Sequence, residues 1–338
     1  MQQEHALNLS NPVQHMMSSD SLLLLEGRAN EGDQQALDEL LNYYQFGGNN
    51  KSPIDEEKAL ELMIKFEENN STIQRQIGSF HYFGKANLPI DFEKALFWYR
   101  KSANNGNSIA MFNVGLLYDR GQGCNKNVKE AFNWFFRAAV AGHGVSQFYV
   151  GMMFDRGEGT EKDIQQAIYW LNQSVVNNCI EGLTYLASMY EKGENIEQDY
   201  SKAFPLFLQG ANMGHVECIY HVGVMYLSGR GVEVNYPLAL KYFLMAATRN
   251  HAEAQYNAGT MYDRGMGCLQ DYTESFKLFM SGAMNGHAIC QYYVGNMLLK
   301  GEGTLVDVKH AIFWMKKAAL QGIPNAIHYI KSMEQESK

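Results

Sequence analysis

Apolar residues in the stretch Ala110–His143 follow a helical period twice, on either side of a polar segment. The first run reads AMFNVGLLY and the polar segment reads DRGQGCNKN. The second run, KEAFNWFFRAAVAGH, places Ala131 and Trp134 on one helical face, with Ala138 a turn later. Apolar positions spaced three and four apart are typical of a helix that buries one face. The stretch therefore predicts two amphipathic helices joined by a turn.

The same pattern returns along the chain with a fixed period. Its Gly-x-Gly turn recurs every 36 residues without insertion or deletion, and the turns begin at Gly121, Gly157, Gly193, Gly229, Gly265 and Gly301. Self-similarity at such a period is the signature of a solenoid, in which each unit packs on its neighbours. We therefore expect an all-α solenoid of about eight 36-residue helix-turn-helix repeats, in place of the two or three domains that 338 residues would ordinarily suggest.

Two other repeat positions carry helix-boundary residues. Asp or Asn precedes each second helix, where the side-chain oxygen can accept hydrogen bonds from first-turn amides. These predicted N-caps are Asp55, Asp91, Asn127, Asp163, Asp199, Asn235, Asp271 and Asp307. Gly or Asn, which tolerate a left-handed backbone, end the same helices. These residues are Gly106, Gly142, Asn178, Gly214, Asn250, Gly286 and Gly322. Glycine inside a first helix, as at Gly115 and Gly259, costs about 1 kcal/mol against Ala and predicts close helix–helix contact.

The two ends of the chain depart from the regular repeat, because terminal repeats are usually atypical. Polar residues without a period predict a flexible tail at the N-terminus. The chain is expected to divide into a tail (residues 1–18), a degenerate capping repeat (19–70), the regular repeats (71–324) and a lone C-terminal helix with a tail (325–338).

The capping repeat and one regular repeat contain irregular elements. In the capping repeat we expect a first helix capped by Ser19 or Asp20, a helix near Gln35–Gln45 and a breaker at Gly47–Pro53. In the regular array, Pro205 falls inside a second helix. A proline there costs about 3 kcal/mol and kinks the helix, so we expect a local bend.

The repeat pattern resembles that of a known family. It reads small-x-x-x-Leu-Gly-x-x-Tyr, then Gly-x-Gly, then Asp-x-x-Lys-Ala-x-x-Trp-x-x-x-Ala-Ala, with close matches in Ala254–Gly267 and Asp163–Trp170. This pattern is similar to the Sel1-like (SLR) repeat, a relative of the tetratricopeptide repeat, over about residues 36–333. The resemblance implies a right-handed α-superhelix with the first helices lining its concave side. It also implies an adaptor that assembles complexes, often in bacterial signalling or host interaction.

Composition excludes several classes of protein. No apolar run approaches the roughly 20 residues that span a membrane, so we expect no membrane insertion. The segment before Leu22–Leu25 has no basic residue and no A-x-A-like cleavage site. We therefore expect a cytoplasmic protein, while signal-independent export into a host stays open. Residues 1–70 hold 13 acidic and 4 basic residues, and the remaining residues are nearly neutral. No basic stripe results, so nucleic acid is not an expected partner.

Cysteines and histidines recur at repeat positions and predict neither disulfides nor a metal site. Cys124 pairs in register with Cys268, and Cys218 with Cys290, but the five cysteines include no C-x-x-C. Reduced thiols that fill small apolar spaces are expected. Four histidines follow the second helix at one position: His143, His215, His251 and His287. Ligands in units about 8–10 Å apart rarely converge to the 2.1 Å or so that Zn²⁺ requires. We expect structural histidines and no metal.

The sequence offers no catalytic constellation or cofactor site. The Gly-x-Gly turns follow helices, and there is no G-x-G-x-x-G, Walker lysine, H-E-x-x-H or G-x-S-x-G. The tryptophans share one repeat position that is elsewhere Leu or Tyr, so they predict core packing: Trp98, Trp134, Trp170 and Trp314. We therefore expect no enzyme, no cofactor and no small-molecule substrate.

The outward side of the first helices carries the candidate site. With Val114 at the centre of the buried face, position 112 lies about 160° away. Aromatic residues fill this position in most repeats: Phe112, Phe148, Tyr220, Tyr256 and Tyr292, with Thr184 as the exception. The next position, usually Asn in the family, carries Tyr149, Tyr185, His221 and Tyr293, and also Tyr329. Arginines within Asp-Arg pairs are expected at the rim: Arg120, Arg156 and Arg264.

Aromatic residues and arginine anchor protein interfaces, so this surface predicts a partner-binding site. In the alternative interpretation, the aromatic residues only pack between adjacent first helices. Our hypothesis is a non-enzymatic scaffold or adaptor that binds a protein or peptide in the concave groove. A regulatory or immunity-type protein that wraps one enzyme or toxin would use the same surface. A hydrolase is a further alternative, implied by cysteine-rich relatives, and the lack of regular cysteine pairs and of a nucleophile–base pair opposes it.

Overall fold

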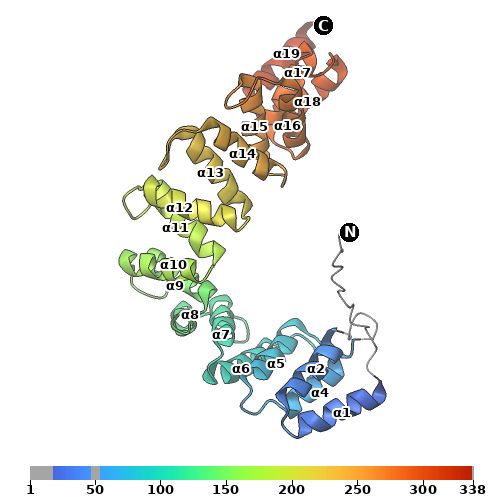
Figure 1. Ribbon diagram of the computed structural model, residues 1–338, viewed down its shortest axis with the longest axis vertical. Helices are drawn as coiled ribbons and strands as arrows, with labels where there is room; N and C mark the ends of the chain where they lie inside the picture. The colour runs from blue at the N-terminus through green and yellow to red at the C-terminus, as the bar shows by residue number, and fades with distance from the viewer. Residues whose placement is uncertain (1–17, 47–53, 337–338) are drawn as a thin grey trace, which may run out of the picture. The chain divides into compact units, whose positions relative to one another are not determined.

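The computed structural model describes residues 18–46 and 54–336, which form helices joined by short turns (Figure 1). These ranges contain no strand, and the predicted all-α repeat fold is confirmed. Apart from Ser18, the predicted tail lies outside the described residues, as does the breaker Gly47–Pro53. The chain divides into two compact units, Met1–Lys162 and Asp163–Lys338.

The first unit comprises residues 19–70, where a capping repeat is expected, and the first regular helices. Its described helices are α1 (Ser19–Asn30), α2 (Gln34–Phe46), α4 (Glu56–Lys65), α5 (Ser71–Phe83), α6 (Phe92–Asn104), α7 (Ser108–Arg120), α8 (Val128–Val140) and α9 (Gly144–Arg156). We call the first helix of each repeat an A helix and the second a B helix. In this unit α5, α7 and α9 are A helices, and each packs against the helix next to it in the chain (Figure 1).

The second unit continues the same alternation. Its helices are α10 (Ile164–Val176), α11 (Ile180–Lys192), α12 (Tyr200–Asn212), α13 (Val216–Ser228), α14 (Tyr236–Ala247), α15 (Ala252–Arg264), α16 (Tyr272–Met284), α17 (Ala288–Lys300), α18 (Val308–Leu320) and α19 (Pro324–Glu336). The A helices here are α11, α13, α15 and α17, and α19 is the C-terminal helix, which begins one residue before the expected segment 325–338. Consecutive helices pack on one another throughout the unit.

The predicted N-caps of the B helices are all confirmed. Each of the eight Asp or Asn side chains accepts a hydrogen bond from a first-turn amide, as Asn127 does from the Glu130 amide at 3.1 Å. The predicted Gly and Asn residues after these helices all have positive φ. At α1 the predicted cap, Ser19 or Asp20, was one or two residues too late, because Ser18 is the cap and its hydroxyl accepts from the Ser21 amide at 3.1 Å.

Close contact between A and B helices at glycine is also confirmed. A Cβ atom added to Gly115 of α7 would lie 2.5 Å from the ring of Phe135 of α8. In the second unit, a Cβ on Gly259 of α15 would lie 2.8 Å from the ring of Phe279 of α16. Both phenylalanines are almost fully buried. Glycine at this position therefore leaves the room in which a B-helix phenylalanine ring approaches the A-helix backbone closely.

The prediction that the tryptophans pack in the core is confirmed fully for two of the four. Trp134 and Trp170 are buried, with 7% and 8% of their surface exposed. Trp98 and Trp314 are half-buried at the edge of the core, and the ammonium groups of Lys101 and Lys317 lie over their rings. The shared position is thus a packing position in every repeat, but its burial depends on the neighbouring helices.

The proline in the second unit lies inside α12, as predicted. Pro205 is exposed and has no amide hydrogen, so the Ser201 carbonyl one turn earlier lacks its usual helical donor. The helix nevertheless runs from Tyr200 to Asn212. The surrounding packing therefore holds the helix across this position.

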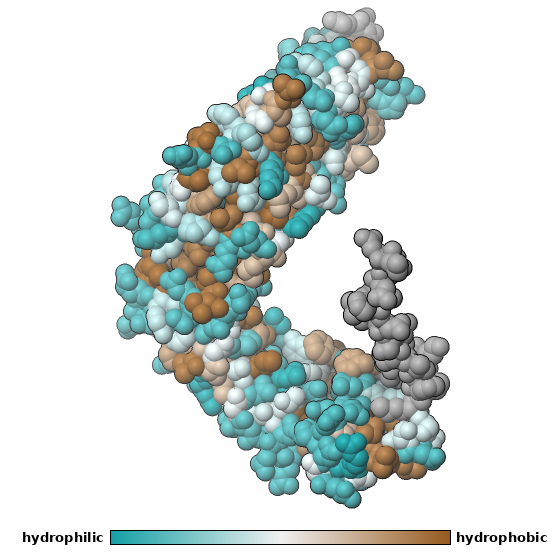
Figure 2. Space-filling view, in the orientation of Figure 1, coloured by the Kyte–Doolittle hydropathy of each residue, from teal (hydrophilic) through white to brown (hydrophobic). Residues whose placement is uncertain are grey.

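The molecular surface mixes polar and apolar residues. On the face shown in Figure 2, apolar residues lie in small groups among polar ones in both units. Within the described residues, no helix has the length and apolar character needed to cross a lipid bilayer.

Candidate functional site

The two predicted aromatic rows lie on the outward side of the A helices. The first aromatic row comprises Phe112, Phe148, Tyr220, Tyr256 and Tyr292, and the second comprises Tyr149, Tyr185, His221 and Tyr293. All nine side chains are half-buried. Burial also raises the pKa of the Tyr220 and Tyr293 hydroxyls. The rows are therefore less open than the helical geometry alone predicts, because neighbouring helices cover part of each ring.

In the first unit, the covering ring comes from a B helix. The Phe112 ring centroid lies 5.5 Å from that of Phe135 and 5.4 Å from that of Tyr149. The Tyr149 ring also lies 5.0 Å from the Phe135 ring. These three residues, from α7, α8 and α9, form one aromatic cluster. Aromatic side chains of neighbouring A helices therefore contact each other, as expected if these residues pack between adjacent first helices.

The second unit repeats this cluster with the same 36-residue spacing. The Tyr293 ring stacks on Phe279 at 4.8 Å and lies 6.0 Å from the Tyr256 ring. The His221 ring stacks on Phe207 at 4.5 Å, with the two planes only 6° apart. Three of the four second-row side chains, those of Tyr149, His221 and Tyr293, therefore rest on a B-helix phenylalanine, whereas Leu171 holds that position before Tyr185. Such support fixes the ring orientation, which lowers the entropy cost of binding a partner on its open side.

Three of the four predicted structural histidines have a more specific role, because they cap A helices. The Nδ1 atoms of His143, His251 and His287 accept hydrogen bonds from the first-turn amides of α9, α15 and α17. Their rings also lie against first-row aromatic side chains: Phe112 at 5.1 Å, Tyr220 at 4.5 Å and Tyr256 at 5.5 Å respectively. Sequence reasoning missed this role, although Asn107, a familiar cap residue, holds the same repeat position before α7.

The fourth histidine shows what the first row contributes. His215 precedes α13 but makes no cap hydrogen bond, and its Nδ1 atom is buried without a partner. The first-row residue of the preceding repeat is Thr184, the one exception to the aromatic pattern. The three histidines that do cap a helix all contact an aromatic ring. The ring thus supports the cap, and the first row has a structural role.

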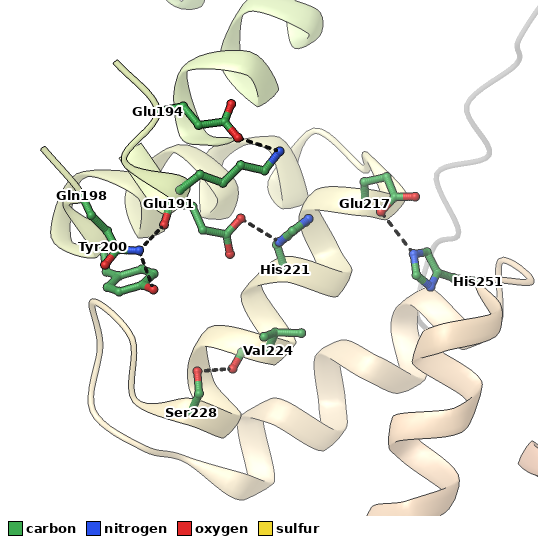
Figure 3. A network of polar contacts seen from close by, with 10 residues as sticks. Glu191, Glu194, Gln198, Tyr200, Glu217, His221, Val224, Ser228 and His251 are labelled. Atoms are coloured by element: carbon green, nitrogen blue, oxygen red, sulfur yellow. Dashed lines mark hydrogen bonds and ion pairs between the residues drawn. The ribbon is translucent and has the colours of Figure 1, made fainter. Parts of the chain in front are cut away.

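Two histidines of the second unit contact carboxylates, as Figure 3 shows. The Nδ1 atom of His221 lies 3.4 Å from Glu191 of α11, and the Nε2 atom of His251 lies 3.2 Å from Glu217 of α13. The hydrogen bond from His221 lowers the pKa of the Glu191 carboxyl group, against the opposing effect of its burial. Each contact joins neighbouring A helices at the outward surface.

The predicted rim arginines are exposed, as expected. Arg120 donates a hydrogen bond to the hydroxyl of Tyr82 at 3.2 Å, and Arg156 lies 3.9 Å from Glu158. Arg264 is exposed at the end of α15. The acidic partner in one Asp-Arg pair behaves differently, because Asp155 is buried, with 6% of its surface exposed. That pair therefore contributes only its arginine to the rim.

The second unit has an acidic row that sequence reasoning missed. Glu181, Glu217 and Glu253 lie in the first turns of α11, α13 and α15, at 36-residue intervals, and all three are exposed. At the same position, the first unit has Ile109, which is 45% exposed, and the half-buried Val145. The interval alone could have revealed this acidic row. The A-helix surface is therefore acidic and aromatic on α11, α13 and α15 of the second unit, and apolar and aromatic in the first unit and on α17, where Ile289 is 39% exposed at the same position.

Among the residues that the structure describes, the thiols and the grouping of titratable side chains mark no further reactive site. The five cysteines are unpaired, and burial raises the pKa of Cys179 to about 11 and those of Cys218 and Cys290 to about 12. Thiols with such values are poor nucleophiles. Within residues 18–46 and 54–336, no three His, Cys, Asp or Glu side chains are grouped closely enough to hold a metal ion.

The repeated A and B helices, with their Asp or Asn caps and Gly-x-Gly turns, define an α-helical repeat protein. The family model described as "Sel1 repeat" matches eight segments: residues 42–71, 74–107, 108–143, 144–175, 180–215, 216–251, 252–287 and 288–323. Because these segments cover most of the sequence, the chain belongs to the Sel1 repeat family. The resemblance seen in the repeat pattern is thereby confirmed, and family members generally mediate protein–protein interactions.

Two solved structures are similar to the chain over most of its length. A protective antigen with an SLR fold, from uropathogenic Escherichia coli strains, shares 25% identity with a TM-score of 0.83, covering 93% of this chain and 67% of the antigen. A Sel1 repeat protein from Oxalobacter formigenes shares 24% identity with a TM-score of 0.68, covering 92% of this chain and 90% of that protein. A search of curated protein sequences finds no match.

Proposed function

We propose that the chain is a non-enzymatic scaffold that binds a protein or peptide partner on the outward surface of its A helices. The observation that carries the proposal is the second aromatic row. In the second unit it places Tyr185, His221 and Tyr293 on three A helices at one repeat position. Half-buried, pre-oriented aromatic rings flanked by charged residues are the usual anchors of protein interfaces.

The pattern of rows also supports this proposal against a purely structural role. The aromatic clusters contain first-row rings and B-helix phenylalanines. On α15 the second-row position is held by Asn257 instead of an aromatic residue, and Phe243 of α14 is still fully buried. The fold therefore tolerates a small polar side chain at this position. Large rings at the same position on α9, α11 and α17 then serve a purpose beyond packing.

Charge complementarity indicates the chemistry of a partner for the second unit. The carboxylates of Glu217 and Glu253 are 62% and 58% exposed, and Glu181 extends the same row. Consecutive A helices lie close enough for side-chain contacts, as between Glu191 of α11 and His221 of α13. A partner segment that carries several Lys or Arg residues would therefore match the acidic row.

The test begins with affinity capture and mass spectrometry, and the captured partner is then purified for binding measurements. The double variant Tyr185→Asn with Tyr293→Asn should retain its helical content, because Asn257 occupies the equivalent position. Its affinity for the partner should fall by about a hundredfold or more, since each anchor contributes about 2 kcal/mol. Tyr169→Asn, which changes a tyrosine 52% exposed on the B helix α10, is the matched control and should bind normally.

A second pair of variants tests the partner chemistry. Glu217→Gln with Glu253→Gln should weaken binding, and the dependence of affinity on salt should become shallower. Unchanged affinity in the tyrosine double variant would refute the proposed surface. An effect of the tyrosine variants without an effect of the glutamine variants would refute only the basic partner segment.

A further inference from the structure

Three A helices begin with a cap that depends on the protonation state of a histidine. The Nδ1 atom accepts the Ser146 amide at 3.3 Å in α9, the Ala254 amide at 3.2 Å in α15 and the Cys290 amide at 3.2 Å in α17. A ring nitrogen accepts a hydrogen bond only while it carries no proton, so each cap requires neutral imidazole with its proton on Nε2. Histidine ordinarily gains its charge between pH 8 and 5 or so.

The same repeat position supplies a comparison that does not titrate. Asn107 caps α7 and Asn70 caps α5 through their side-chain oxygens. An amide oxygen remains an acceptor at every pH of interest. The starts of α5 and α7 are therefore expected to be insensitive to pH, whereas those of α9, α15 and α17 depend on how each histidine is surrounded.

The surroundings of His287 disfavour its charged form. Its ring stacks on Tyr256 of α15, and Glu253 on the same helix is the nearby charged group among the described residues. Burial lowers the pKa of His287 from its usual 6.5 despite the opposing attraction of Glu253. The positive end of the α17 dipole also opposes a cation at this position. The cap is therefore fully present above about pH 6.5 and is lost as the pH falls through the lowered value.

The other two capping histidines have different surroundings. Burial alone lowers the pKa of His143, but its Nδ1 atom lies 2.8 Å from the Ser146 hydroxyl, which can accept a hydrogen bond from a protonated ring. His251 has a carboxylate on each side: Glu217 lies 3.2 Å from Nε2 and Glu253 lies 3.5 Å from Nδ1. With a protonated ring, Nδ1 could no longer accept from the Ala254 amide, but its N–H could donate to Glu253 in the same first turn, which would keep the ring attached to the start of α15.

We propose that mildly acidic pH releases the first turn of α17, and to a smaller degree that of α9, while α15 stays anchored. Protonation of His287 turns its Nδ1 from an acceptor into a donor that faces the Cys290 amide, and the first turn separates from the ring. The same ring supports Tyr256, so the first aromatic row loosens beside α17. This pH response belongs to the fold and is independent of whether a partner binds there.

Hydrogen exchange with mass spectrometry at pH 7.5 and pH 5.0, corrected for the intrinsic effect of pH on exchange, tests the proposal in the full chain. Peptides from the start of α17 should lose protection by about fivefold or more at pH 5.0, the effect expected from a lost cap. Peptides from α15 should lose less, and those from α7 should not change. In His287→Asn, which copies the Asn107 cap, the pH dependence at α17 should disappear.

Three results would overturn the proposal. Equal protection of α17 at both pH values would show that His287 stays neutral or is not needed. An undiminished pH dependence in His287→Asn would place its origin elsewhere. An equal loss of protection at α7 would indicate general acid unfolding. If His287→Asn fails to fold, His143→Asn applies the same test to α9 in the other unit.

Discussion

At the residue scale, cysteine thiols fill small spaces between helices. Cys218 of α13 lies against Gly210 of α12, and Cys290 of α17 lies against Gly282 of α16, in both cases where the glycine leaves room for sulfur. Both thiols are fully buried. Cys124 is half-buried in a turn, with its sulfur 3.7 Å from the Leu117 carbonyl oxygen. Solvent access thus differs strongly among thiols that look alike in sequence.

We therefore expect alkylation in the native protein to follow burial. Cys124 and Cys268 should react first, whereas Cys218 and Cys290 should react only as the protein unfolds, because their raised pKa values leave almost no thiolate at neutral pH. Peptide mass mapping after timed exposure to iodoacetamide measures the order. Labelling of Cys218 as fast as Cys124 under native conditions would contradict the packing described for α12 and α13.

Pro205 is a second position where a single side chain is expected to change the free energy of unfolding. Pro205→Ala restores an amide that can donate to the Ser201 carbonyl, so the free energy of unfolding should rise, by up to about 3 kcal/mol. Denaturant titration measures the change. Lys241→Ala, at the same repeat position in α14, is the matched control and should have little effect. A clear loss of stability in Pro205→Ala would mean that the proline ring itself contributes packing.

Some single residues could be predicted from sequence and others could not. The Asp and Asn caps could be predicted because one oxygen acts on amides two or three residues away. The imidazole caps could not, because their stability depends on a ring such as Phe112 from the preceding repeat. The burial of Asp155 and the partial covering of Tyr149 likewise depend on neighbouring helices, which a calculation on one isolated helix omits.

At the element scale, each helix is short and depends on its ends. The B helices of the regular repeats have 12 or 13 residues, so first-turn and last-turn amides and carbonyls are a large share of their hydrogen-bonding groups. Helices of this length are marginal in isolation. The caps and the contacts with neighbouring helices therefore determine whether each helix forms.

Removal of an N-cap oxygen should lower stability in either half of the second unit. Asp163→Ala at α10 and Asp271→Ala at α16 should each cost about 1 kcal/mol. Asp271→Asn should cost little, because Asn127 and Asn235 cap α8 and α14 in the same way. Equilibrium unfolding by circular dichroism measures these differences. If Asp271→Asn were as damaging as Asp271→Ala, the carboxylate charge and not the cap hydrogen bond would be responsible.

Most helix boundaries could be predicted, and the failures have local causes. The start of α4 was predicted at its cap Asp55, but its end at Lys65 is followed by Phe66 and not by the Gly or Asn that ends the other B helices. Asn69 adopts a positive φ and Asn70 caps α5, so the chain turns earlier than its polarity suggests. Boundaries marked by one specialised residue are predictable, whereas those set by a turn of several polar residues are not.

At the scale of the whole molecule, the repeat period predicts the fold class, but it does not predict where the chain divides into two compact units. The 36-residue register continues through Lys162 and Asp163, where the chain divides into two units, and no change in composition occurs there. Each unit has its own A-helix surface with a different character. The proposed partner segment with basic residues therefore concerns the second unit, and the first unit offers apolar residues such as Ile109 and Val145.

The central claim is that a protein partner binds the outward surface of the A helices. Hydrogen exchange with and without the purified partner tests this claim without any mutation. In the second unit, the account predicts slower exchange in peptides of α11, α13, α15 and α17, and unchanged exchange in peptides of the B helices α12, α14 and α16. Protection of those B helices, with the A-helix peptides unchanged, would contradict it.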